Sequence, residues 1–583
     1  MALKVVPENQ QFIDALPQAL QSEVLDRLEA LMKLSNPVPW QQVDAQLQLI
    51  KVIAASPFSV QIFLLNPQLL DHALLTKRVS KPQLKRLLMA DMQEVTNETQ
   101  LHQSLRQFRK AHQVRLIWRN RCGLGSSEQL VEDLSNLADV CVDLALTWLH
   151  DDSVKQWGQP TNRDGQPQEL VVLGMGKLGG KELNLSSDID LIFSFPAPGE
   201  TQGGRRSLDN QQFFIRLGQR LIQAIDAVTA EGFVFRVDMR LRPYGASGAL
   251  ALSFDAMEIY YQQQGREWER YAFVKARVIA GNQAPGQQLL ELLRPFVYRK
   301  YLDYSAIESL RSLKQMIASE VRRRGLEQNV KLGTGGIREV EFIAQAFQLI
   351  RGGRDNRLQT SSLMAVLDVL PETAGLASSD VEKLRTGYWF LRDVEHALQA
   401  VHDTQTQDLP SQEADQARLA VALGYSCWDS LQAQINTTRD FIHQQFELVV
   451  ALKEDNDSQG LDHQLSQLWA EISHSAHQTD ELTLLPEWQQ RLSQAGFTDV
   501  DRILQHLWEL HQSRPAQTMQ PVAQERLAQL MPQILHITAQ QTHPARTLAR
   551  VMVLIEAVLR RSVYLVLLQE NPAALRLLVQ LCA

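Results

Sequence analysis

The segment from residue 171 to residue 195 constrains the fold most, because it joins a glycine-rich turn to two acids one residue apart. Residues 171–173 are all apolar and predict a buried strand that runs into the turn. Residues 189–195 predict a second strand. Since side chains alternate across a strand, Asp188 and Asp190 should project from the same face, a few ångströms apart. Two like charges held this close favour a bound divalent cation.

The turn before these acids is rich in glycine and contains a lysine. Glycine lets the backbone approach a ligand closely, so that bare N–H groups face phosphate oxygens. A tight turn without any ligand is the simpler interpretation of such a segment taken alone. The candidate phosphate contacts in the turn are Gly174, Gly176, Lys177, Gly179 and Gly180. The hydroxyl of Ser187 could bind a phosphate or cap the turn before the second strand, and the cap is the simpler role.

A third acid lies in a stretch that alternates apolar and polar residues. From Phe233 to Arg242 every second residue is apolar, which predicts a strand with one apolar face. Asp238 falls on the opposite face among arginines, of which Arg240 and Arg242 are candidates to meet phosphate oxygens. A salt-bridge ladder on an exposed strand is the alternative. Beside the first pair of acids, Asp238 is a candidate third metal ligand.

A later segment offers a second group of phosphate candidates. Gly335 and Gly336 precede a helix that should begin at Ile337, and a helix start presents N–H groups and a positive dipole end to an anion. Lys331 and Arg338 flank this point as possible phosphate contacts. The alternative is an ordinary helix start with Arg338 paired to the acid three residues later. On a further helix, Arg392, Glu395 and His396 have apolar neighbours and predict a polar network inside a bundle.

Taken together and in order, these motifs resemble glutamine synthetase adenylyltransferase, the family of bifunctional adenylylating and adenylyl-removing enzymes. The resemblance rests on residues 173–180, 187–190 and 236–243, and continues in residues 265–277 (GREWERYAFVKAR), 331–342 (KLGTGGIREVEF) and 391–399 (LRDVEHALQ). It covers the chain from near residue 50 to near residue 450.

The resemblance implies an α+β fold that is mostly α-helical, with a nucleotidyltransferase core of the polymerase-beta-like type flanked by helical bundles. It implies that Asp188 and Asp190 bind two ions, Mg²⁺ or Mn²⁺, and that Asp238 binds the ion that activates the entering oxygen. It assigns this chain to the adenylyl-removing half of the family. In that reaction inorganic phosphate attacks an adenylyl-tyrosine of glutamine synthetase and releases ADP, which controls nitrogen assimilation. The expected partners are glutamine synthetase, the PII signal protein, ADP or ATP, and phosphate.

Two alternatives remain open on the residues alone. A uridylyltransferase of the PII protein has a similar turn before Asp-x-Asp, although it lacks the continuation from Arg240 to Pro243 and the motif at Trp268 to Arg270. A non-catalytic module that binds nucleotide or signal protein and scaffolds glutamine synthetase is the other. Keeping three acids together without a metal would be costly, which argues against the scaffold.

Length and charge limit the remaining classes. A chain of 583 residues should form several domains with ample buried core. Its 58 basic and 66 acidic residues give a net charge of −8, which offers no general attraction to nucleic acid. The four cysteines show no metal or disulfide spacing and predict thiols in a reducing cytoplasm. The absence of a signal pattern or a membrane-length apolar run predicts a soluble protein without membrane contacts.

Periodicity and composition, together with the family resemblance, divide the chain into five predicted regions. They are an N-terminal helical region (1–150), the catalytic core (151–295) with a crossover helix from Phe213 to Val228, a helical bundle (296–452), a linker with connecting helices (453–524), and the truncated start of a second catalytic half (525–583). The resemblance, which implies two catalytic halves in tandem, supplies the identity of the last region. The acidic run from Glu454 to Gly460 should be a linker. Residues 562–575 echo residues 59–70, which supports the second-half assignment. Leu565, Leu568, Leu575 and Leu578 should therefore dock on preceding helices or form an exposed apolar stripe.

Overall fold

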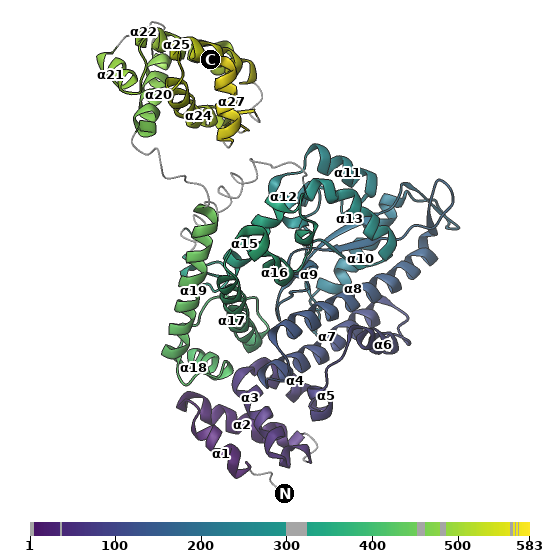
Figure 1. Cartoon of the computed structure of the whole chain (residues 1–583). Coiled ribbons are helices and arrows are strands. Elements are labelled where there is room, and N and C mark those ends of the chain that lie inside the picture. The colour runs from purple at the N-terminus through teal and green to yellow at the C-terminus, as the bar shows by residue number, and fades with distance from the viewer. Residues whose placement is uncertain are drawn as a thin grey trace. The chain divides into compact units, whose positions relative to one another are not determined.

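The fold is taken from a computed structural model of the chain (Figure 1). The structure describes residues 5–34, 38–298, 323, 325–451, 461–478, 485–519, 521–559, 564–565, 567–568 and 571–583. These residues divide into two compact units, the first ending at residue 449 and the second beginning at residue 450. Helices dominate both units and the strands all lie in the first, so the predicted α+β, mostly α-helical class is confirmed for the described residues.

The first unit begins with the helices that periodicity predicts. They are α1 (Pro7–Asp14), α2 (Gln18–Leu34), α3 (Val43–Ala55), α4 (Pro57–Leu65), α5 (His72–Thr76), α6 (Lys81–Asp91), α7 (Glu98–Arg121) and α8 (Ser127–Trp157). The side chains of Asn97 and Ser126 cap α7 and α8 by accepting backbone N–H groups, which fixes where these helices start. Among the described residues no single helix is long and apolar enough to cross a bilayer. The pair α3 and α4 passes that test together, but it bends by 113° at its break.

A five-stranded mixed sheet forms the centre of the first unit. Its strands run in the order β5 (Arg236–Asp238), β3 (Asp188–Phe195), β2 (Val171–Gly174) and β7 (Arg277–Ala280), with β6 (Ala251–Ser253) also paired to β3. Strand β3 is parallel to β5 and β6 and antiparallel to β2. The strands predicted at residues 171–173 and 189–195 are therefore confirmed. A separate antiparallel pair joins β1 (Gln159–Asn162) to β4 (Gly199–Gln202).

Helices α8 and α10 (Asn210–Asp226) pack around this sheet and share its core. The crossover helix predicted from Phe213 to Val228 is confirmed as α10, which begins three residues earlier behind an Asp209 cap. Gly218 lets α10 approach closely, since a Cβ there would lie 2.8 Å from the ring of Phe193 on β3. The central strand is thus held from one side by a helix that leaves no space for a larger residue.

The strand predicted from Phe233 to Arg242 is much shorter in the structure. Only β5, residues Arg236–Asp238, pairs with the sheet, and the alternation prediction is wrong beyond it. The chain then turns back on itself, with Tyr244 and Gly245 at positive φ. The guanidinium of Arg242 stabilises this turn by donating to the carbonyls of Met239, Ala246 and Gly248. The alternation of apolar and polar residues does not indicate that Arg242 bonds to turn carbonyls, so the pattern does not predict where the strand ends.

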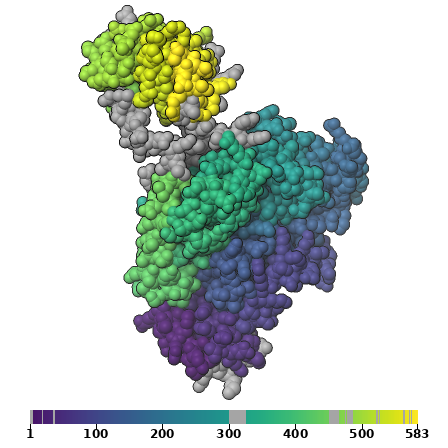
Figure 2. Space-filling view, viewed as in Figure 1, coloured from purple at the N-terminus to yellow at the C-terminus, as the bar shows by residue number. Residues whose placement is uncertain are grey.

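The rest of the first unit is helical. The helices are α11 (Phe254–Gln263), α12 (Glu267–Phe273), α13 (Gln283–Val297), α15 (Ile337–Arg351), α16 (Leu363–Ala374), α17 (Ser378–His402), α18 (Glu413–Ala422) and α19 (Trp428–Ala451). The predicted helix start at Ile337 is confirmed. Helix α17 contacts α4 and α8 of the N-terminal region as well as α15, α16 and α18. In the space-filling view the green surface of α15 to α19 lies directly against blue and teal segments (Figure 2).

The second unit is one helical cluster. It contains α20 (Leu461–Gln478), α21 (Pro486–Gln494), α22 (Val500–Gln512), α23 (Arg514–Gln517), α24 (Pro521–Ala539), α25 (Pro544–Val558) and α27 (Pro572–Cys582). A single apolar core runs through it from Leu465 to Cys582, so residues on both sides of the boundary predicted at 525 pack together. Of the four leucines predicted to dock or to form an exposed stripe, Leu565 and Leu575 are fully buried and Leu568 and Leu578 are half-buried. The acidic run at 454–460 lies outside the described residues.

The shared core makes the predicted boundary at residue 525 testable. Leu530 on α24 is fully buried in the core that also contains α20 residues. We expect Leu530→Ala to destabilise the second unit by about 2–5 kcal/mol. Hydrogen exchange of α20 amides should rise, because their packing partner is lost. Leu577→Ala is the control, since Leu577 is 57% exposed on α27. Unchanged exchange in α20 would mean that the two sides of residue 525 are independent.

Candidate active site

The three acids predicted from the sequence meet at one edge of the sheet. Strand β3 is buried at Ile189 and Leu191, so Asp188 and Asp190 both point to the opposite, more open face. The parallel register with β5 places Asp190 directly opposite Asp238, and Asp188 opposite Arg236. Since directly opposed residues share a face of the sheet, the backbone brings all three carboxylates to the same surface.

Two of these acids are already paired with arginines. Nε of Arg236 lies 2.7 Å from Oδ1 of Asp188, and Nη2 of Arg240 lies 2.5 Å from Oδ2 of Asp238. The hydrogen bonds from Arg240 lower the pKa of the Asp238 carboxyl. The Arg240 side chain is 82% exposed, so water screens this pair and its contribution to stability is small. Arg236 is a site residue that the sequence analysis did not select.

Asp190 differs from its two neighbours. Among the described residues no donor bonds to its carboxylate. Burial raises the pKa of Asp190 to about 6, and the charges of Asp238 and Asp188 add to this effect, while Lys331 opposes it. A half-buried carboxylate beside two others is costly unless a cation compensates it. Asp190 is therefore the acid with most to gain from a bound cation.

Of the three acids, Asp190 is the one that the glycine-rich turn approaches. The N–H of Met175 donates to the backbone carbonyl of Asp190 at 2.9 Å, which ties the turn to β3. Gly176 has φ +51°, and a Cβ there would lie 2.8 Å from Oδ2 of Asp190. The other three glycines serve packing instead. A Cβ would meet Ile279 at Gly174, the backbone of Lys275 at Gly179, and the Glu182 side chain and Ser361 backbone at Gly180.

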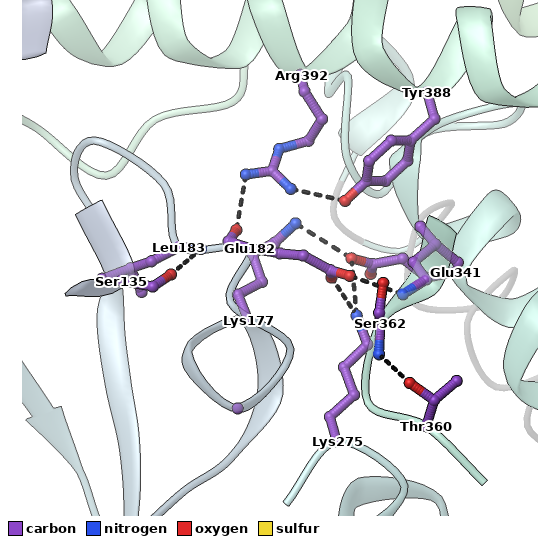
Figure 3. Close-up of polar contacts among 12 residues, drawn as sticks. Ser135, Lys177, Glu182, Leu183, Lys275, Glu341, Thr360, Ser362, Tyr388 and Arg392 are labelled. Atoms are coloured by element: carbon purple, nitrogen blue, oxygen red, sulfur yellow. Dashed lines mark hydrogen bonds and ion pairs between the residues drawn. The ribbon is translucent and has the colours of Figure 1, made fainter. Parts of the chain in front are cut away.

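Lys177 extends into a buried ion-pair cluster with Glu341 (Figure 3). Its Nζ lies 3.2 Å from Oε1 of Glu341, while Nζ of Lys275 lies 2.5 Å from Glu182 and 3.8 Å from Glu341. Burial opposes the ionised form of Glu341, but the surrounding cations outweigh it and hold its pKa far below the usual range. Glu341 therefore pairs with these two lysines and not with Arg338, as the alternative to a phosphate role for Arg338 would have required. A phosphate contact by Lys177 remains a prediction, and it would require this pair to open.

Ser187 and Arg242 both bond to nearby backbone. The Ser187 hydroxyl donates to the carbonyl of Asp188 at 3.0 Å, a local contact at the start of β3. Arg242 is occupied by the carbonyls of the turn after β5. Their phosphate contacts remain predictions, because each group has a backbone partner in the structure.

Lys331 and Arg338 are the most available of the predicted cations. Neither side chain makes a hydrogen bond or ion pair with any residue that the structure describes. The charge of Lys331 lowers the pKa of both Asp190 and Glu341, so it lies within electrostatic reach of the acids.

The start of α15 does not offer the free N–H groups that were predicted. The N–H groups of Gly336, Ile337 and Arg338 donate to Gly333, Val330 and Lys331 respectively. Arg439 on α19 stabilises the same loop by donating to the carbonyls of Thr334 and Glu327. A tight loop folded over the helix start consumes these donors, which the dipeptide Gly-Gly does not reveal. The N–H groups of Gly336, Ile337 and Arg338 are therefore not available to an anion.

The three acids suit a divalent cation in their chemistry, because carboxylate oxygens are the ligands that Mg²⁺ and Mn²⁺ prefer. Within the described part of the chain, no three acidic, histidine or cysteine side chains converge closely enough to form a ready metal site. Arg236 bonds to Asp188 through Oδ1 alone, so Oδ2 of Asp188 has no bonded partner among the described residues. Arg240 bonds to both oxygens of Asp238 and would have to turn away for an ion to bind there. Asp188, Asp190 and Asp238 remain the predicted ligands.

Sequence reasoning missed the buried cluster beneath the turn. Glu182, Lys275 and Glu341 were not selected, and the pairs they form join residues 93 and 164 apart in the chain. No local pattern identifies such partners. Arg236 had a usable signal, since it lies two residues before Asp238 and so shares its strand face.

Comparison with known proteins places this geometry in a family. Residues 46–292, which contain the three acids, match the family described as glutamate-ammonia ligase adenylyltransferase. This part of the chain belongs to that family. Residues 311–450 match a second family, described as GlnD PII-uridylyltransferase.

Relatives over most of the chain carry a single name. The chain is 48% identical over 587 residues to the bifunctional glutamine synthetase adenylyltransferase/adenylyl-removing enzyme of Pseudomonas putida. This match covers 99% of this chain and 58% of the relative. The enzyme of that name from Pseudomonas aeruginosa is 50% identical over 86% of this chain and 51% of its own length. That of Hahella chejuensis is 45% identical over 92% of this chain and 55% of its own length. The chain thus spans a little over half the length of these adenylyltransferase relatives.

Because Gly176 lies close to the Asp190 carboxylate, adding one methyl group at this position should weaken metal binding. Gly176→Ala should push the Asp190 carboxylate aside and weaken Mn²⁺ binding on the order of tenfold. The alanine at positive φ also costs about 1–2 kcal/mol of stability. Gly123→Ala is the matched control, because Gly123 has φ +68° and nothing within 4 Å of its added Cβ. Equal Mn²⁺ affinities of the two variants, measured by electron paramagnetic resonance, would contradict the expectation.

The raised pKa of Asp190 predicts that Mn²⁺ affinity depends on pH. Below about pH 6 this carboxyl takes up a proton and is lost as a ligand. Mn²⁺ should therefore bind about tenfold more weakly at pH 5 than at pH 7, because metal and proton compete for the same group. The affinity should fall as the pH is lowered through 6 and recover as it rises. In Asp190→Asn this step should vanish, and a variant that keeps it would assign the titration to another group.

Proposed function

We propose that this chain is a metal-dependent nucleotidyltransferase that removes adenylyl groups from glutamine synthetase. The observation that carries the proposal is the register that sets Asp190 opposite Asp238, with Asp188 on the same face and Gly176 against Asp190. The names of the adenylyltransferase relatives supply the protein substrate. We further propose a polymerase-beta-like core, since the acids lie on neighbouring strands after a glycine-rich turn.

The proposed chemistry divides between the acids and the two available cations. Asp188, Asp190 and Asp238 would hold one or two Mg²⁺ or Mn²⁺ ions, which when bound offset charge on the oxygens around the reacting phosphorus. Lys331 and Arg338 have no bonded partner among the described residues and would bind oxygens of the phosphate or of the adenylyl group. Arg240, largely exposed, would leave Asp238 and turn to the same anion. The backbone at Gly176 allows close approach beside Asp190.

We propose that the reaction is phosphorolysis. Inorganic phosphate would attack the phosphorus of the adenylyl-tyrosine, the bond to the tyrosine oxygen would break, and ADP and free tyrosine would leave. Three carboxylates suit transfer in either direction, so the direction rests on the family resemblance of the motifs. Binding of the PII signal protein and a cytoplasmic location belong to the same proposal.

A uridylyltransferase acting on the PII protein is the second candidate. It is favoured by the match of residues 311–450 to the GlnD PII-uridylyltransferase family. That match covers α15 to α19 and not the three acids. The adenylyltransferase match covers the acids themselves, and we therefore prefer adenylyl removal.

The decisive experiment is a phosphorolysis assay on adenylylated glutamine synthetase. With Mg²⁺ and phosphate the chain should release ADP, and omission of either should stop the reaction. Asp190→Asn should lower the rate at least a hundredfold, about 3 kcal/mol of transition-state stabilisation. Asp164→Asn, at an exposed loop position, is the matched control for the loss of one carboxylate.

Three outcomes would count against the proposal. Release of AMP without phosphate would indicate hydrolysis. Transfer from UTP to the PII protein, without ADP release from adenylylated glutamine synthetase, would favour the second candidate. An Asp190→Asn chain with full activity would move the site elsewhere.

A further inference from the structure

Five residues, from Glu182 to Ser186, join the glycine-rich turn to β3 and its acids. The alternate members of this segment bond to helix α17. Nη2 of Arg392 donates to the Glu182 carbonyl at 2.8 Å, and the Asn184 amide donates to Oε1 of Glu395 at 2.7 Å. Figure 3 shows Arg392 reaching down from its helix to the Glu182 carbonyl. The segment therefore runs along α17 and not free between turn and strand.

The contacts continue to the start of the strand. The N–H of Ser186 donates to Oε1 of Gln399 at 2.9 Å, and its hydroxyl donates to the carbonyl of Asp403 at 3.1 Å. Arg392, Glu395 and Gln399 are three or four residues apart, which places them on one face of α17, and Asp403 follows directly after the last residue of the helix. The partners in the segment are two residues apart, which places them on one side of an extended chain. Successive turns of the helix therefore bond to every second residue of the segment.

The other side of the segment is also bonded. The N–H of Leu183 donates to the hydroxyl of Ser135 at 3.1 Å, and the Leu185 carbonyl accepts from the Gln113 amide at 3.2 Å. The same Gln113 amide donates to Asp403 at 2.8 Å. Helices α7 and α8 therefore close the segment from the side opposite α17. A displacement of α17 cannot be absorbed by the segment alone.

A further pair of bonds connects the segment to the acids. Nη2 of Arg236 donates to the Ser186 hydroxyl at 3.1 Å, while its Nε donates to Asp188 at 2.7 Å. Gln399 and Asp403 therefore act on Asp188 through Ser186 and Arg236. They also set the position of the whole start of β3, which carries Asp190 two residues later.

Gln399 serves this segment and nothing else in the described part of the chain. It is 1% exposed, its oxygen accepts from Ser186, and its buried amide nitrogen has no hydrogen-bond partner there. An unpaired buried amide costs stability. A residue kept only to stabilise the bundle would be better replaced by an apolar one, so its value lies in holding Ser186.

We propose that the face of α17 formed by Arg392, Glu395 and Gln399, together with Asp403 just after the end of the helix, positions the acids of β3, which makes Gln399 a positioning residue for metal binding. The inference rests on the proposed function, since it takes Asp188 and Asp190 as metal ligands. It extends the site into the region that matches the second family, residues 311–450. The helical bundle is then part of the active site's frame and not an accessory to it.

Gln399→Leu in the full chain tests this inference. The variant should bind Mn²⁺ about tenfold more weakly, as outer partners of metal ligands commonly do when lost. The Mg²⁺ concentration for half-maximal adenylyl removal should rise by the same factor, with the rate recovering at saturating Mg²⁺. Gln348→Leu on α15 is the matched control. Gln348 is 3% exposed and bonds to the carbonyls of Leu358 and Thr360, so the variant should lose stability without losing Mn²⁺ affinity.

Ser186→Ala provides a second, smaller change if Gln399→Leu fails to fold. It removes the hydroxyl that links Asp403 to Arg236 and should also weaken Mn²⁺ binding about tenfold. Mn²⁺ affinities of Gln399→Leu and Ser186→Ala equal to that of Gln348→Leu would overturn the inference and leave the proposed function standing. If Asp190→Asn binds Mn²⁺ as tightly as the unchanged chain, the proposed metal site itself is rejected.

Discussion

The parallel pairing of β3 with β5 is the constraint on which the site depends. Three residue pairs in register, each 48 positions apart in the chain, bring Asp238 to the surface that carries Asp188 and Asp190. A slip of one residue would turn one of the two strands' acids to the opposite face. The short β5 has little pairing energy of its own. Arg236 supports the register by bonding across the two strands to Asp188, and the hydrogen bonds of Arg242 stabilise the turn that follows β5.

The charged side chains near the site are arranged by local pairing, which the net charge of the chain does not reveal. The chain is acidic overall, yet the cations near the site are distributed in two layers. Beneath the turn, Lys177 and Lys275 neutralise Glu182 and Glu341 in a buried cluster that fixes the turn against α15. Around the acids, Arg236 and Arg240 hold carboxylates in an exchangeable way, while Lys331 and Arg338 remain available. The first layer contributes to rigidity, and the second has the freedom that binding an anion requires.

The sequence predicts those parts of the fold that depend on local pattern. Residues 171–173 and 189–195 form strands, α10 crosses the sheet and α15 starts at Ile337, because apolar periodicity and glycine placement act within a few residues. The shared face of Asp188 and Asp190 follows from strand geometry alone. The prediction fails where a distant or unexpected partner decides. Arg242 holds a turn directly after β5 where a longer strand was predicted, and the loop at 330–336, held by Arg439, accepts the N–H groups at the start of α15. The ion pair between Lys177 and Glu341 likewise joins residues far apart in the chain, and no local pattern indicates it.

The contacts between segment 182–186 and α17 also bear on the order in which the molecule is assembled. They join residues 210 to 217 positions apart. During synthesis the acids of β3 leave the ribosome long before their supports on α17 exist, since chains grow at about 5–20 residues per second. For an interval on the order of ten seconds the strand has its carboxylates but not the helix that aligns them. The site is therefore among the last features of the first unit to mature, and a nascent chain carries its ligands without a competent centre.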